Sequence, residues 1–164
     1  MLSQMMMLKM FGFNHQTNNR LLDLATMLTP EQWDAPQDIG RRSSLRETMF
    51  HTLIVEEEWV YFCEHSVTRF DFRKIEDYPD VASLRRFSDD TYQWIQGYLE
   101  NLDEEKLTAT ITGAAPGDVE RNFSVWYILL HAVFHSAQHR SEAAEMLTRF
   151  GYSPGFIDFI NHDL

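Results

Sequence analysis

Apolar residues recur every three or four positions over four long stretches of this chain, which is the spacing of amphipathic α-helices. The pattern predicts helices over roughly residues 2–28, 45–65, 84–102 and 125–150. The third stretch is the most regular, and its apolar stripe comprises Leu84, Phe87, Thr91, Trp94, Ile95, Tyr98 and Leu102. We interpret this aromatic stripe as core.

Residues that begin and end helices stand at the borders of these stretches. Thr29-Pro30-Glu31-Gln32 ends the first helix and starts a short helical turn, because Thr29 can cap it and Gln32 completes a capping box. Ser44-Leu45-Arg46-Glu47 predicts a second capping box. Asp80 or Ser83 can cap the third helix and Ser124 the fourth. Gly151 is a normal C-terminal stop.

The segment between the third and fourth helices has a different pattern. Residues 107–112 alternate as in a strand, and residues 113–118 contain the glycines and the proline of a turn. We expect a loop or a small β-hairpin in residues 103–123. After the fourth helix, we expect the tail to pack on the bundle end through Phe156, Phe159 and Ile160.

Four long helices in 164 residues predict an all-α protein, a four-helix bundle that forms a single domain over residues 1–164. The connections of roughly ten residues or more allow helices that are not neighbours in the bundle to follow each other in the chain.

Composition excludes several classes of function. A net charge of −11 argues against a nucleic-acid surface, which needs clustered Lys and Arg, and against binding to anionic membranes. No apolar run has the length of a membrane span, and the Met-rich start lacks the features of a signal peptide. The single cysteine, Cys63, fits a reducing cytoplasm, and we expect a buried side chain with no catalytic role.

Histidines supply the candidate chemistry. His131, His135 and His139 share one helix face, because each step of four residues rotates by only about 40°. Either adjacent pair can chelate one metal ion, and His51 on the second helix is the obvious third ligand. The competing interpretation is a set of interior histidines without a metal. Glu58 lies two turns after His51 and can be a partner of a ligand, an extra ligand, a general base or a solvated glutamate.

Three segments, taken in order, resemble the DinB/YfiT-like family of metalloenzymes. They are Asn18-Asn19-Arg20-Leu21-Leu22 with the Leu-Thr-Pro-Glu turn after it, residues 45–54 followed by Glu56 to Glu58 and Trp59, and residues 130–140. The resemblance covers nearly the whole chain and implies that His51, His135 and His139 bind the metal. It places His131 near the site without making it a ligand. The family often continues Gly-Gln-Ile after the final His-Arg pair, whereas this chain has Ser141-Glu142-Ala143, which puts a carboxylate near the pocket.

The resemblance also implies a reaction class. Some relatives are transferases or isomerases that use low-molecular-weight thiols such as mycothiol or bacillithiol, so the first hypothesis is metal activation of a thiol toward a small-molecule substrate. Glu58 and Glu142 are the candidate proton acceptors. Zinc and nickel fit three imidazoles, and iron also accepts them. The alternatives are a non-catalytic metal-binding protein of the stress response and a hydrolase acting through metal hydroxide. The sequence is compatible with a homodimer.

Overall fold

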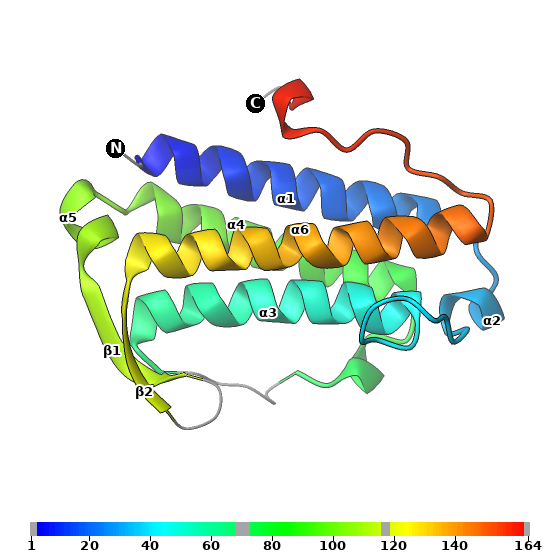
Figure 1. The fold of residues 1–164 in the computed structure, drawn as a ribbon, viewed down its shortest axis with the longest axis horizontal. Helices are drawn as coiled ribbons and strands as arrows, with labels where there is room; N and C mark the ends of the chain where they lie inside the picture. Colours follow the sequence, from blue (N-terminus) through cyan, green and yellow to red (C-terminus); the bar gives the residue numbers. More distant parts are fainter. Residues whose placement is uncertain (1–2, 68–72, 116–118, 163–164) are drawn as a thin grey trace.

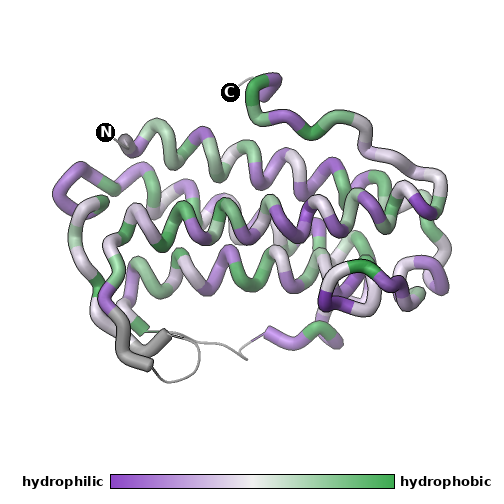
Figure 2. The backbone as a smooth tube through the Cα atoms, in the orientation of Figure 1, coloured by the Kyte–Doolittle hydropathy of each residue, from purple (hydrophilic) through white to green (hydrophobic). Residues whose placement is uncertain are grey.

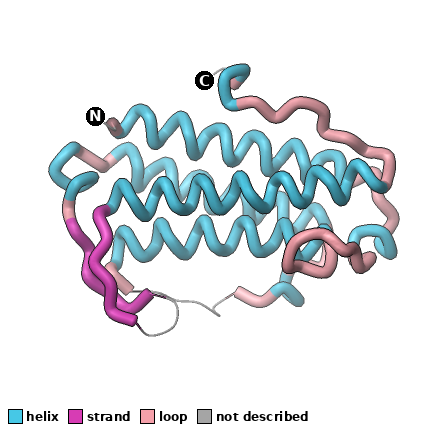
Figure 3. Tube along the Cα trace, viewed as in Figure 1, coloured by secondary structure: helices cyan, strands magenta, loops and turns pink. Residues whose placement is uncertain are grey.

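A computed structural model describes residues 3–67, 73–115 and 119–162 of the chain. Four long helices lie side by side and a short hairpin sits at one end of them (Figures 1 and 3). The long helices are α1 (Gln4–Ala25), α3 (Leu45–His65), α4 (Val81–Glu100) and α6 (Val125–Arg149). The short elements are α2 (Pro30–Trp33), η1 (Ile75–Asp77), α5 (Glu104–Thr108), β1 (Thr110–Ala115), β2 (Val119–Ser124) and η2 (Phe159–Asn161). The all-α bundle predicted from the sequence is confirmed.

The helices follow an up-down-down-up order. Helices α1 and α6 run in one direction, and α3 and α4 run in the other (Figure 1). The most extensive helix contacts are those of α3 with α6 and of α1 with α4, and α1 also packs on α6 and α3 on α4. Consecutive helices α1 and α3, like α4 and α6, therefore lie diagonally in the bundle, which requires the long connections that the sequence shows. No described helix combines the length and the hydropathy of a membrane span.

The helix starts mostly match the predicted caps. The capping box of α2 is complete, with Gln32 N–H donating to the Thr29 hydroxyl and Thr29 N–H donating to Gln32 Oε1. At α3 only half of the predicted box forms. The Ser44 hydroxyl accepts from Glu47 N–H, but the Glu47 carboxylate accepts from the N–H and hydroxyl of Ser43 instead of from Ser44. Ser124 precedes α6 without a side-chain cap, because it still belongs to β2.

The predicted hairpin exists, with β1 and β2 antiparallel and Ile111 opposite Phe123. Its start was placed wrongly, since Leu107 and Thr108 end α5 and the strand begins at Thr110. Gly113 was expected in the turn but lies inside β1. A Cβ at residue 113 would stand 2.6 Å from a ring carbon of Phe62, so this glycine lets the strand cross closely over α3. The predicted turn residues 116–118 lie outside the described residues.

The C-terminal tail runs back over α1, and the expected packing on the bundle end is mostly wrong (Figure 1). Phe156 and Ile160 are 88% and 89% exposed. The tail is held by both polar and apolar contacts. Arg20 donates to the Phe156 carbonyl at 3.1 Å, and Ile157 packs against an apolar cluster of the bundle. Of the three predicted side chains, that of Phe159 packs edge-on to the ring of Phe13 at 5.3 Å.

The interior contains two apolar clusters, one toward each end of the bundle. Figure 2 shows hydrophobic and hydrophilic residues intermixed along each long helix. The first cluster includes Met7, Phe11 and Phe62, and the second includes Leu22, Met49 and Met146. Cys63 belongs to the first cluster, where burial raises the pKa of its thiol. Its predicted burial is confirmed.

A buried polar network occupies the middle of the bundle. Oε2 of Glu56 accepts hydrogen bonds from Ser136 Oγ at 2.6 Å and from Asn14 Nδ2 at 2.8 Å. The Arg140 guanidinium donates to Asn14 Oδ1 at 2.6 Å. Burial raises the pKa of Glu56 and lowers that of Arg140 to about 10. The network joins α1, α3 and α6 through groups that are costly to bury alone.

Replacing Glu56 by Ala is expected to destabilise the protein by about 3 kcal/mol, because it removes the acceptor of two hydrogen bonds and leaves Arg140 as a buried charge without its counter-ion. Glu56→Gln keeps an oxygen acceptor and should cost less. Urea unfolding followed by circular dichroism measures both free energies of unfolding. An Ala variant within about 0.5 kcal/mol of wild type would contradict a structural role for the network.

Candidate metal centre

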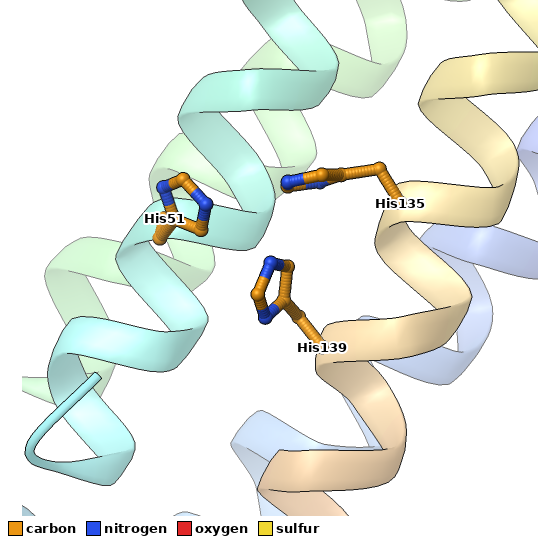
Figure 4. A group of neighbouring side chains, drawn as sticks. All are labelled: His51, His135 and His139. Carbon is orange, nitrogen blue, oxygen red and sulfur yellow. The ribbon is translucent and has the colours of Figure 1, made fainter. Parts of the chain in front are cut away.

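Three histidines from two helices meet at the middle of the bundle. The ring of His51 on α3 and the rings of His135 and His139 on α6 point toward one another (Figure 4). The centroid of the His51 ring lies 5.0 Å from that of His135 and 4.8 Å from that of His139. The rings of His135 and His139 are 4.5 Å apart. The geometry follows from one helical step of four residues on α6 and from the antiparallel contact of α3 with α6.

The three side chains fit a metal ion. One nitrogen from each ring can be chosen so that all three lie within 4.8 Å of one another. Bonds of about 2.0–2.1 Å to a tetrahedral ion need nitrogens ~3.3 Å apart, so the three nitrogens must move closer together to bind one ion. Nδ1 of His135 is buried and has no hydrogen-bond partner among the described residues. A buried nitrogen without a partner is costly, and a bound ion nearby is one explanation for such an atom.

His131 lies outside this group. Its ring is 6.1 Å from that of His135 and packs edge-on against Trp59 at 5.0 Å. His131 and His139 are each four residues from His135, so spacing along α6 does not distinguish them. The facing residue of α3 does, because His139 meets the ring of His51 whereas His131 meets Trp59.

The site favours neutral imidazoles. The pKa of His51 is lowered to about 3, mainly by burial and then by the positive charge of Arg42. The pKa of His135 is lowered to about 4, again mainly by burial, with a contribution from the neighbouring histidines. Both rings are therefore uncharged at neutral pH, the form in which a ring nitrogen can bind a metal ion.

Glu142 contacts one of these histidines directly. The Nδ1–H of His139 donates to Glu142 Oε2 at 2.6 Å, and both side chains are largely buried. This bond selects the tautomer that leaves the lone pair on Nε2. The sequence predicted Glu142 near the pocket as a proton acceptor, but this contact with His139 was not predicted. Its three-residue separation from His139 on one helix was the available signal.

Glu58 does not join the three histidines. It is only 1% exposed on α3, and no described carboxylate belongs to the group of candidate ligands. Its burial rules out the solvated-glutamate interpretation, and its role as a proton acceptor stays a prediction.

Arg42 is a residue of the site that sequence analysis missed. It lies in the loop before α3, and its Nη2 is 3.1 Å from Nδ1 and 3.3 Å from Nε2 of His51. Nothing in the local sequence distinguishes it from its neighbour Arg41, because the contact depends on how the loop folds against α3.

The lowered histidine pKa values predict acid sensitivity of the metal-free protein. Between pH 6.5 and pH 4 the unfolded chain takes up protons on His51 and His135 while the native protein does not, so the free energy of unfolding falls as the pH falls. His51→Asn should make this fall less steep, whereas His65→Asn at an exposed position should not. Urea unfolding from pH 7 to pH 4 measures the slopes. Equal slopes for wild type and His51→Asn would contradict the lowered pKa of His51.

Comparisons with known proteins place the chain. The model of the DinB family matches residues 1–163. YjoA, a DinB-like protein of Bacillus subtilis, is 16% identical over 88% of this chain and 92% of its own, with a TM-score of 0.64. YfiT of Bacillus subtilis, described as a probable metal-dependent hydrolase with an unusual four-helix bundle topology, is 15% identical over 93% of this chain and 92% of its own, with a TM-score of 0.70. No curated protein matches the sequence. With the four-helix topology and the family match over almost its full length, the chain belongs to the DinB family.

Proposed function

We propose that the protein is a metal-dependent enzyme in which His51, His135 and His139 hold one divalent ion. The observation that carries the proposal is the convergence of three imidazoles, two of them with pKa values far below the ordinary value for histidine. Zinc and nickel suit such a site, and iron also accepts three histidines. Three protein ligands leave a coordination position open, which is the pattern of catalytic sites.

The bound ion would lower the pKa of a water molecule or a thiol held at the open position. The residues of the chain prepare the site for this chemistry. Burial keeps His51 and His135 neutral, and Glu142 orients His139 through its Nδ1–H. In this proposal Glu142 is a positioning residue, because its hydrogen-bonded oxygen already accepts from His139. Glu58 remains a candidate proton acceptor.

Hydrolysis of a small-molecule substrate is the reaction that the site supports best. Neutral ligands preserve the charge of the ion, so water at the open position can serve as the nucleophile without a separate strong base. The description of YfiT as a probable metal-dependent hydrolase supports the same reaction for this chain. Family membership favours a second candidate, the transfer or isomerisation of a group with a low-molecular-weight thiol as the nucleophile at that position.

A turnover assay separates the candidates. The protein is loaded with zinc or nickel and supplied with activated esters, amides and phosphoesters, and separately with electrophiles plus a low-molecular-weight thiol. We expect metal-dependent turnover in one series and a loss of at least about 100-fold in His135→Ala. Metal binding without turnover in either series would instead support the non-catalytic alternative.

The ligand set predicts one metal ion per chain, lost from His51→Ala and from His135→Ala while the helical content remains, because the bundle core does not include the ion. His131→Ala should retain the metal, since the ring of His131 packs on Trp59. Elemental analysis after gel filtration measures the occupancy. A larger loss in His131→Ala than in His139→Ala would move the second ligand of α6 to His131.

Glu142→Gln is expected to weaken metal binding by about 10- to 100-fold, because the amide no longer attracts the Nδ1–H of His139 as a carboxylate does. Glu145→Gln is the matched control, since Glu145 lies three residues after Glu142 on α6 and pairs with Arg149. Competition with a chromophoric chelator measures both affinities. Indistinguishable affinities for the two variants would remove Glu142 from the site.

A further inference from the structure

The guanidinium of Arg42 stands at the edge of the histidine group without a conventional partner. It forms no ion pair with any described carboxylate, and its described hydrogen-bonding contact is the ring of His51. The side chain is exposed to solvent, and its charge helps to lower the pKa of His135 as well as that of His51. Arg42 therefore faces both the site and the solvent.

The other arginines with hydrogen bonds in the described chain donate them to oxygen atoms, as Arg73 does to the carboxylate of Glu57. Hydrogen bonds from Ser43 lower the pKa of Glu47, and the nearby positive charge of Arg42 adds a smaller contribution. Oε2 of Glu47 accepts from the N–H and hydroxyl of Ser43, both at 2.8 Å. Arg42 is thus left available for an oxygen acceptor that the described residues do not provide.

The loop that carries Arg42 is held against both helices of the site. Gln37 N–H donates to the Ser43 carbonyl at 2.6 Å, which closes the loop just before α3. Gly40 has a φ of +65°, and a Cβ at this residue would lie 2.5 Å from the carboxyl carbon of Glu142 on α6. The backbone can pass this close to the site because residue 40 has no side chain. Arg42 is therefore positioned by the fold.

A metal ion on His51 changes what Arg42 can contact. A guanidinium has only donors and cannot share the ring lone pair that a metal ion takes. Two cations beside one imidazole also repel each other. An anion placed between them accepts from the guanidinium and binds the metal ion, which turns the repulsion into two attractions. Carboxylate and phosphate groups match the planar fork of an arginine.

We propose that Arg42 is a substrate-binding residue of the histidine site and that the substrate carries a carboxylate or phosphate group, held between Arg42 and the metal ion. This inference rests on the proposed function, because it requires a metal ion at His51. The inference extends the proposed function by a class of substrate, an anion, although the chain itself has a net charge of −11. The attraction is local to the site and does not come from the overall charge.

The test uses the full-length protein loaded with cobalt(II), whose visible spectrum reports changes at the metal. Acetate and inorganic phosphate are titrated into wild type, Arg42→Gln and Arg42→Lys, with acetamide as the neutral counterpart of acetate. Arg41→Gln is the matched control, because it removes the same charge from the adjacent exposed residue. Cobalt affinity is measured separately for each protein by chelator competition, and circular dichroism checks folding.

We expect Arg42→Gln to bind acetate and phosphate about tenfold more weakly or worse, while it binds cobalt at least as tightly as wild type because a repelling charge is gone. Arg42→Lys should fall between the two, and Arg41→Gln should match wild type. Anion affinities that are equal in wild type and Arg42→Gln would overturn the inference and leave the metal site intact. A wild-type protein that takes up no cobalt, zinc or nickel would overturn the proposed function together with it.

Discussion

The antiparallel contact between α3 and α6 determines where the functional side chains of this protein lie. It places His51 against His139, and about one turn further along it places Glu56 against Ser136. A slip of one helical turn would move these pairs by about 5.4 Å, which exceeds the reach of both the hydrogen bonds and the histidine group. The geometry of the candidate metal centre is therefore a consequence of helix register, and the register is fixed by contacts outside the centre.

Helix α6 connects these two sets of contacts through residues that are adjacent in sequence. His135 and His139 face His51, while the next residue in each case, Ser136 and Arg140, belongs to the buried polar network. Consecutive residues point about 100° apart, so one rotation of the helix satisfies both faces at once. Apolar residues could fill the same interior space, often with equal stability. We interpret the network as the contact that fixes the rotation of α6 about its axis and thereby orients His135 and His139 toward His51.

Local patterns explain how much could be predicted. The four helices and the row of histidines follow from periodicity and capping, and these depend on residues close together in the chain. The contacts that prediction missed join segments far apart or depend on the path of a loop. Arg42 reaches His51 only because of the loop conformation. Gly113 lies inside a strand and not in a turn, at a point where the strand passes too close to Phe62 for a side chain. The exposure of Phe156 was missed because hydrophobicity alone does not show what surface is available to cover a side chain.

The burial of Cys63 has a consequence for a protein with a metal centre of this kind. It is the one sulfhydryl in the chain, and burial holds it in the protonated form, which is the unreactive one. Exchange with a disulfide requires an accessible thiolate. The folded protein therefore resists covalent capture by oxidised small thiols, and its sulfur cannot compete with the histidines for a soft metal ion.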